Sequence, residues 1–295
     1  MRIILFGNGM GGSDSLESLS QMGHEILVVC PPGGKFRDWH ESILEKSAHL
    51  GVECIDPEDP NQKEVVKKLK KFEPDIILSI LYHKILSREV LSLVEHSINF
   101  HPSLLPSYRG TAPLIWAMVN GEREVGVTAH QMTERVDSGD YYARVRIPIN
   151  PLETGFELHN KVASKFAPLV SQVVEDISNN SLKKLEPLDL PESVHTSKTK
   201  YVNHLNPRKQ TKARIHNIVR ALAPPLPPAW IETSEGRMQV YRVVDLEAPL
   251  LPEILEARKN SGHETFVHEG NWYIIALDGL IQISDFSIDS TQFDD

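Results

Sequence analysis

The first twelve residues, Met1-Arg2-Ile3-Ile4-Leu5-Phe6-Gly7-Asn8-Gly9-Met10-Gly11-Gly12, carry a short apolar stretch directly into a glycine-rich loop. The apolar part is typical of a buried strand, and the residues after the glycines have the spacing of a helix. Similar β-rich runs at residues 26–30, 76–81 and 98–100 alternate with helical patterns at 16–22, 39–50, 64–71 and 89–94. This alternation predicts an α/β fold with a Rossmann-like parallel sheet.

The pattern changes twice further along the chain. Helical spacing at residues 112–119 and 156–177 flanks strand-like stretches at 125–132 and 141–149. The polar, proline-containing stretch 178–207 is typical of a linker that crosses a surface. We then expect a helix at 211–222 and short strands at 229–231, 238–244, 265–268, 272–277 and 280–284. Five short strands predict a smaller OB-like β-barrel, so we expect domains over residues 1–190 and 191–295.

The composition is that of a soluble globular protein, with 40% hydrophobic and 24% charged residues in 295. No apolar run approaches the roughly 20 residues that cross a bilayer, and the start of the chain does not resemble a signal peptide, so we expect a cytoplasmic protein. Cys30 and Cys54 are the only cysteines, which favours a reducing compartment and no bound metal. The net charge of −9 argues against a polyanion as the main partner.

The glycine-rich loop matches only part of a dinucleotide-binding fingerprint. Residues 7–12 fit G-x-G-x-x-G between a strand and a helix. The fingerprint also needs an acidic residue at the end of the second strand, but that place reads Val28-Val29-Cys30-Pro31-Pro32. We therefore favour glycines that allow a tight turn or admit a substrate, and we keep an NAD-dependent dehydrogenase as a rival interpretation.

The residues best suited to chemistry lie in Ser97-Ile98-Asn99-Phe100-His101-Pro102-Ser103-Leu104-Leu105-Pro106-Ser107-Tyr108-Arg109-Gly110. Asn99 and His101 are two residues apart at the end of an expected strand, so their side chains lie on the same side of the sheet. The carboxyl ends of the strands are where an open α/β sheet places its ligand crevice. A lone histidine there is usually a core residue, but the Asn partner and the rigid proline loop favour a functional site.

A second polar loop, Thr133-Glu134-Arg135-Val136-Asp137-Ser138-Gly139-Asp140, follows the next expected strand. By themselves its Asp and Gly residues are ordinary turn formers. The two segments together resemble the folate-dependent formyltransferase family, whose pattern is Asn-x-His-x-Ser-Leu-Leu-Pro-x-x-Arg-Gly followed by an Asp-x-Gly loop. The resemblance covers roughly residues 1–180 and extends more weakly into the second domain.

The resemblance implies that the first domain is a formyltransferase domain with 10-formyltetrahydrofolate as its cosubstrate. Asn99, His101 and Asp137 match the catalytic trio of the family. His130 is not part of the pattern, and we interpret it as structural. The residues that match folate-lining segments are Lys84, Ile85, Leu86, Thr133, Glu134, Arg135, Val136 and Asp137.

The residue types suit formyl transfer to an amine without any metal. When the amine attacks, the formyl oxygen becomes an oxyanion that needs hydrogen-bond donors, and the leaving folate nitrogen needs a proton. Asn99 offers a side-chain amide. A protonated His101 can donate to the same oxygen, and the carboxylate of Asp137 would favour that imidazolium.

The family offers three kinds of acceptor amine. A glycinamide ribonucleotide acceptor would not require the residues beyond about 190. A methionyl-tRNA acceptor predicts excess positive charge, yet the basic segment from Lys198 to Arg220 lies within a region, residues 196–295, in which acids outnumber bases. The basic loop that tRNA enzymes insert after the second strand is not visible at residues 31–38. Residues 112–122 and 216–222 look more like enzymes acting on nucleotide-linked 4-amino sugars, which we prefer, with methionyl-tRNA formyltransferase as the alternative.

Two interpretations from other classes remain open. The chain could be a binding module for nucleotide, RNA or glycan, although that role would not need Asn99, His101 and Asp137 together. It could also be a hydrolase that releases formate from the same cosubstrate. The sequence leaves open which amine is used, the pathway, whether a homodimer forms, and whether the basic segment is more than a solvated linker.

Overall fold

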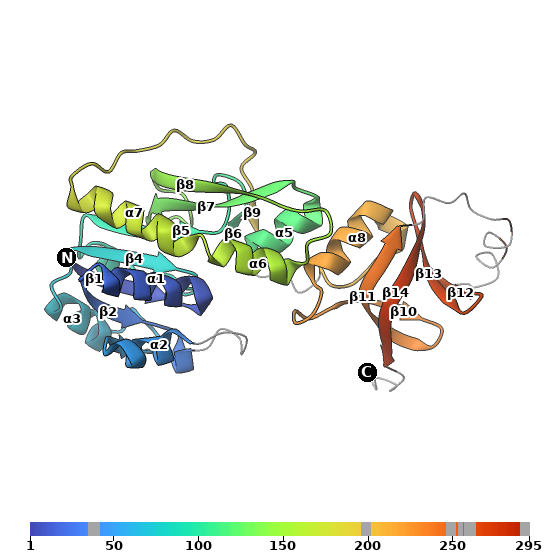
Figure 1. Ribbon diagram of the computed structural model, residues 1–295, viewed down its shortest axis with the longest axis horizontal. Coiled ribbons are helices and arrows are strands. Elements are labelled where there is room, and N and C mark those ends of the chain that lie inside the picture. The colour runs from blue at the N-terminus through green and yellow to red at the C-terminus, as the bar shows by residue number, and fades with distance from the viewer. Residues whose placement is uncertain (35–41, 196–201, 246–251, 253–255, 257–263, 290–295) are drawn as a thin grey trace. The chain divides into compact units, whose positions relative to one another are not determined.

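The computed structural model describes residues 1–34, 42–195, 202–245, 252, 256 and 264–289 (Figure 1). The chain divides into two compact units, each made of discontinuous segments. Unit 1 comprises Met1–Gly110, Val125–Ile147 and Asn160–Val194, and unit 2 comprises Thr111–Glu124, Pro148–His159 and His195–Asp295. The domain boundary expected between residues 190 and 191 stays a prediction.

A seven-stranded sheet in the order β3-β2-β1-β4-β5-β7-β8 forms the centre of unit 1. The neighbours from β3 to β5 pair in parallel, and β7 pairs with β5 in the antiparallel direction. The expected parallel α/β sheet is therefore confirmed. The strands are β1 (Arg2–Gly7), β2 (Glu25–Val29), β3 (Glu53–Ile55), β4 (Ile76–Ile80), β5 (His96–His101), β7 (Glu124–Gln131) and β8 (Tyr141–Pro148).

Apolar strand residues and helices build the core of unit 1. One cluster joins Ile4 and Phe6 of β1 to Val66 of α3 and Val90 of α4. On the other side, α1 packs against α2 and α7. Burying such side chains contributes roughly 1.5–3 kcal/mol each. The helices are α1 (Gly9–Gln21), α2 (Ile43–Leu50), α3 (Lys63–Lys71), α4 (Arg88–Leu91) and α7 (Phe166–Ser178).

The glycines of the first loop serve close packing. Gly9 to Gly12 already belong to the first turn of α1, capped by the side chain of Asn8. A Cβ atom on Gly11 would lie 2.9 Å from Cδ2 of Phe166, and one on Gly12 would lie 3.2 Å from the carbonyl carbon of Gly7. Small residues are thus required where α1 approaches β1 and α7, which gives the glycines a structural reason independent of any dinucleotide.

The prediction of one continuous helix over residues 156–177 is wrong. The stretch 156–177 forms two helices, α6 (Gly155–Ala163) and α7, which begins at Phe166. Pro168 stands in the first turn of α7, where the missing amide hydrogen costs nothing, so the sequence favours a new helix start there. The expected helix at 39–50 is observed as α2 from Ile43, and its residues 39–41 lie outside the described residues.

Unit 2 carries an antiparallel sheet in the order β10-β11-β14-β13-β12. The five expected strands are therefore confirmed, and closure into an OB-like barrel stays a prediction. The strands are β10 (Ala229–Thr233), β11 (Gly236–Asp245), β12 (Thr265–His268), β13 (Asn271–Ala276) and β14 (Gly279–Asp289). The helices α5 (Pro113–Asn120) and α8 (Lys212–Ala221) pack together, and α8 lies against β11.

In the part of the chain that the structure describes, no helix is long and apolar enough to span a bilayer.

Candidate active site

The polar site of unit 1 begins at the carboxyl end of β5. Asn99 and His101 point to the same side of the sheet, as expected from their spacing. The antiparallel register with β7 places Asn99 opposite His130 and His101 opposite Thr128. Two polar cross-strand pairs thus stand side by side where β5 ends.

Asp137 reaches this cluster from the loop after β7. Its backbone has a positive φ of 49°, a left-handed conformation that Asp tolerates better than most residues. The Oδ2 atom accepts a hydrogen bond of 2.8 Å from the amide of Gly110 and lies 3.5 Å from Nδ1 of His101. The Oδ1 atom accepts a 3.3 Å hydrogen bond from the side-chain amide of Asn99. The structure therefore brings Asn99, His101 and Asp137 together.

His101 is buried and has a partner at each ring nitrogen. Nε2 lies 2.8 Å from the carbonyl oxygen of Tyr108, and because a carbonyl only accepts, this nitrogen carries a hydrogen. Burial lowers the pKa of His101 below its ordinary value, while the Asp137 carboxylate and the Tyr108 carbonyl oppose that shift only in part. Burial and the carboxylate thus act in opposite directions on the pKa of His101, and the expectation that this site uses the imidazolium stays a prediction.

Asp137 stays ionised in this environment. Burial works against its charge, but the neighbouring imidazoles of His101 and His130 and the amide of Gly110 together outweigh burial. These contacts hold the pKa of Asp137 well below its usual range. The site thus keeps a negative charge that can stabilise a proton added to a neighbouring group.

His130 belongs to the same cluster. Its side chain is 2% exposed, and its Nε2 lies 3.1 Å from the amide nitrogen of Asn99 and 3.4 Å from Oδ1 of Asp137. Its Nδ1 lies 2.9 Å from the carbonyl oxygen of Gln131, which assigns the ring hydrogen to Nδ1 and leaves Nε2 as an acceptor for Asn99. Both hydrogens of the Asn99 amide therefore have acceptors in this state.

The loop after β5 is held by a segment far along the sequence. The short strand β6 (Arg109–Gly110) pairs with β9 (Val194–His195). The amide of Tyr108 donates a 2.8 Å hydrogen bond to Oγ of Ser193, and the guanidinium of Arg109 lies 3.0 Å from the carboxylate of Glu192. Part of the expected linker 178–207 thus fixes the carbonyl that contacts His101, a role that its polar composition did not reveal.

An ion pair joins the second of the two segments expected to line a folate pocket to a residue just after the first. Arg88 Nε lies 3.9 Å from Glu134 Oε1, with both side chains exposed. Each segment also presents an apolar side chain to solvent, Ile85 with 72% and Val136 with 49% exposed surface. The ammonium of Lys84 donates to the carbonyl oxygens of Glu58 and Pro57.

A family model described as formyl transferase matches residues 1–174 of the chain. This match covers more than half of the sequence, and the chain therefore belongs to the formyl transferase family. The matched residues contain the whole cluster of Asn99, His101, His130 and Asp137.

Solved structures of similar fold include an N-formyltransferase from Helicobacter canadensis in complex with folinic acid and dTDP-3-aminofucose, with a TM-score of 0.73 and 20% identity over 97% of this chain and 99% of that one. A 4-N formyltransferase from Francisella tularensis has a TM-score of 0.67 and 20% identity over 84% and 98%. HypX from Aquifex aeolicus in complex with tetrahydrofolic acid has a TM-score of 0.63 and 16% identity over 97% of this chain and 43% of that chain.

Proposed function

We propose that this chain transfers the formyl group of 10-formyltetrahydrofolate to the primary amine of a nucleotide-linked amino sugar. The observation that carries the proposal is the cluster of amide, imidazole and carboxylate at the end of β5, inside the part of the chain that matches the family. Asn99, His101 and Asp137 are the catalytic residues in this proposal. Such a reaction of small polar substrates suits the cytoplasm, where we place the protein.

Asn99 and His101 would act on the oxygen of the formyl group. Attack by the amine turns the carbonyl oxygen into an oxyanion, and donors that are already in place stabilise it more than they stabilise the ground state. The amide hydrogens of Asn99 point to His130 and Asp137 in the resting site, so one of them changes partner when substrate is bound.

His101 would gain its second proton only during the reaction. Burial makes a second proton on this imidazole unfavourable in the resting site, and a negative charge forming nearby raises its proton affinity. Nδ1 faces the ionised Asp137 at 3.5 Å, so a proton placed on Nδ1 is stabilised by the carboxylate. The proton lost by the amine can in this way be held before it reaches the leaving folate nitrogen.

We propose that the folate lies against the segments Lys84–Leu86 and Thr133–Asp137. The exposed Ile85 and Val136 offer apolar surface to a flat ring system. Leu86 belongs to the hydrophobic cluster against which Met132, just before the second segment, packs, and this supports the proposal.

The choice of acceptor rests on the similar folds and on charge. The Helicobacter canadensis enzyme was crystallised with a dTDP-linked amino sugar, and its whole length aligns with this chain, including the C-terminal sheet. A tRNA acceptor would require a basic surface, whereas the chain carries a net charge of −9. An amino-sugar nucleotide is therefore our first proposal, whether the amine is at the 3 or 4 position, and methionyl-tRNA is the alternative.

Separate incubations with the purified protein and 10-formyltetrahydrofolate test the acceptor class. The acceptors are dTDP-linked and UDP-linked 3-amino and 4-amino sugars, unformylated methionyl-tRNA, and buffer alone, with tetrahydrofolate release as the readout. Release that depends on an amino-sugar nucleotide supports the proposal. Release that depends only on the tRNA would assign the protein to the alternative, and equal release in buffer would indicate a hydrolase.

A further inference from the structure

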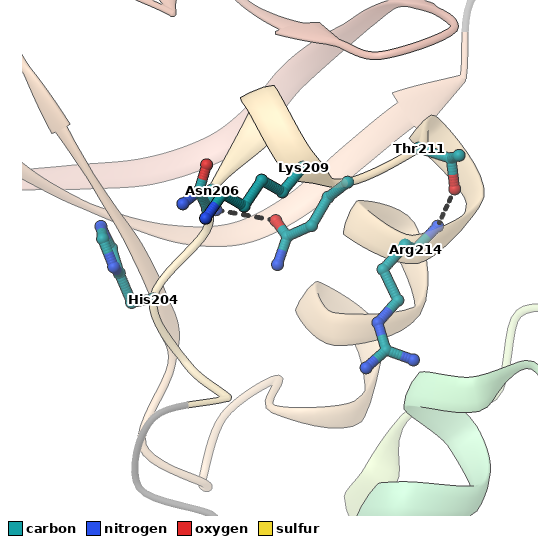
Figure 2. Close-up of a pocket in the computed structure, with 6 residues that line it drawn as sticks. His204, Asn206, Lys209, Thr211 and Arg214 are labelled. Carbon is teal, nitrogen blue, oxygen red and sulfur yellow. Dashed lines mark hydrogen bonds between the residues drawn. The ribbon is translucent and has the colours of Figure 1, made fainter.

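Unit 2 contains a pocket with a volume of about 600 Å³ that lies entirely within residues 204–214 (Figure 2). This volume is within the usual range for small-molecule sites, roughly 300–1,000 Å³. The lining residues are His204, Asn206, Lys209, Gln210, Thr211 and Arg214. The chemistry proposed for unit 1 makes no use of this pocket, and none of its residues belongs to unit 1.

The lining is polar and carries only positive charge. Lys209 and Arg214 bring cationic side chains, and Asn206, Gln210 and Thr211 supply amide and hydroxyl groups. None of the six residues is acidic. Two acids have contacts beside this segment: Asp278 accepts the amide of Lys212, and Glu264 pairs with Arg208. A pocket of this kind favours an anion.

The walls of the pocket are held by the backbone of unit 2. The amide of Asn206 donates a 2.8 Å hydrogen bond to Oε1 of Gln210, so the Nε2 donor of Gln210 is fixed in orientation. The carbonyl of Gln210 accepts the amide of Leu277 at 3.0 Å. Figure 2 shows the Asn206–Gln210 bond and the cap that Thr211 forms with the amide of Arg214, 3.2 Å long. A site whose donors are already placed loses less entropy on binding.

Lys209 and Arg214 have different roles in this wall. The guanidinium of Arg214 donates from Nη1 to the carbonyl of Val119 and to Oδ1 of Asn120, at 2.8 and 2.6 Å, which fixes the plane of the group. Lys209 is exposed, and the described contacts give its ammonium no acid as a partner. A flexible point charge beside a fixed planar donor is a common arrangement around phosphate oxygens.

One lining residue, His204, is held in place by an aromatic stack. The ring of His204 lies 4.1 Å from that of Trp230 with an interplanar angle of 19°, and Arg237 covers Trp230 at 4.2 Å. The backbone of this edge is tied to β10, because Leu205 donates to the carbonyl of Trp230 at 2.9 Å. His204 is therefore an exposed flat ring in a fixed orientation, which offers a surface to a nucleobase.

We propose that this pocket is a second ligand site that binds a nucleotide, with its phosphates at Lys209 and Arg214 and its base against His204. The site is separate from the formyl-transfer chemistry, so it stands even if the acceptor proposed above is wrong. It also gives a function to the basic segment. Lys198 and Lys200 of that segment lie outside the described residues.

Lysine footprinting on the full chain locates the binding. The protein is treated with an amine-reactive acylating reagent alone and with pyrophosphate, UDP, dTDP or uridine, and each lysine is then measured by mass spectrometry. We expect several-fold protection of Lys209 by pyrophosphate, UDP and dTDP and none by uridine, because the phosphates provide the contact. Unchanged labelling of Lys209 in every case, or equal protection by uridine, would overturn the proposal.

Matched variants then test whether this pocket itself carries the binding. Lys209→Glu should raise the dissociation constant of UDP at this pocket by about tenfold, the usual effect of losing a charged hydrogen bond. Arg208→Glu changes charge at the adjacent residue, which does not line the pocket, and should leave that binding unchanged. An equal loss of UDP binding in both variants would show that the positive charge of the whole segment binds the nucleotide, and not this pocket. Protection of Lys209 by tRNA but not by UDP would likewise contradict a nucleotide site.

Discussion

The amide nitrogen of Asn99 lies 3.1 Å from Nε2 of His130, its partner directly across the β5–β7 ladder. His130 is in turn oriented by the carbonyl of Gln131. A residue that we interpreted from the sequence as merely structural therefore sets the direction in which the Asn99 amide points.

His130→Ala should lower kcat by about ten- to a hundredfold, because a small misplacement of a reacting group can have an effect of that size. His130→Gln keeps an acceptor near Asn99 and should recover part of the rate. KM for both substrates should stay close to that of the native protein, since His130 acts through Asn99. Equal losses in the two variants, or native turnover in both, would contradict this positioning role.

Asn99→Ala and His101→Ala should each lower kcat by about a hundredfold or more, the usual effect of removing one oxyanion donor. Circular dichroism and thermal unfolding should show that both variants fold. His268→Ala, a histidine change on β12 in unit 2, serves as the control and should keep the native rate. Native-like turnover in either site variant would remove that residue from the proposed mechanism.

Unfolding at different pH values tests the charge state of His101. Burial lowers its pKa in the folded protein from the ordinary value of 6.5. As the pH falls through about 6.5, the unfolded chain binds a proton that the folded site excludes, so the free energy of unfolding decreases by up to about 1.4 kcal/mol per pH unit for this group. His101→Asn should reduce that slope in urea titrations. An unchanged slope would show that folding does not shift the pKa of His101, and a steeper slope in His101→Asn would show that the folded site favours the protonated ring.

Gly139→Ala tests the backbone packing that holds the Asp137 loop. A Cβ atom at this position would collide with the carbonyl of Gln131, so the loop must shift and carry Asp137 with it. We expect a loss of about 1–3 kcal/mol in stability and a larger fall in kcat than stability alone explains. Gly270→Ala, at a hairpin with φ of 75° and open space around it, is the control for backbone strain. Equal activity in the two variants would contradict the argument.

The sequence predicted the sheet well because its strands are short, apolar and separated by clear helices. Ile3 to Phe6 and Ile76 to Ile80 are fully buried neighbours in the sheet, as their composition indicates. Asn99 and His101 were also found from sequence, because their alternation alone fixes which face they share.

His130 was missed because its role depends on strand order. Thr128 and His130 alternate like Asn99 and His101. Only the antiparallel pairing of β7 with β5 places the first two residues opposite the second two. Likewise Glu192 and Ser193 lie more than eighty residues from the loop that they hold, and no local pattern predicts such a contact. The lowered pKa of His101 could not be predicted either, because burial is a property of the fold.

The fate of the formyl group tests the central proposal most directly. The protein is incubated with 10-formyltetrahydrofolate carrying a labelled formyl carbon and with the amino-sugar nucleotide that supports turnover, and the label is then traced. We predict that the label appears on the sugar nitrogen in equal amount to the tetrahydrofolate formed, and that His101→Ala abolishes both. Label recovered as free formate, with the amine unchanged, would contradict formyl transfer and show hydrolysis.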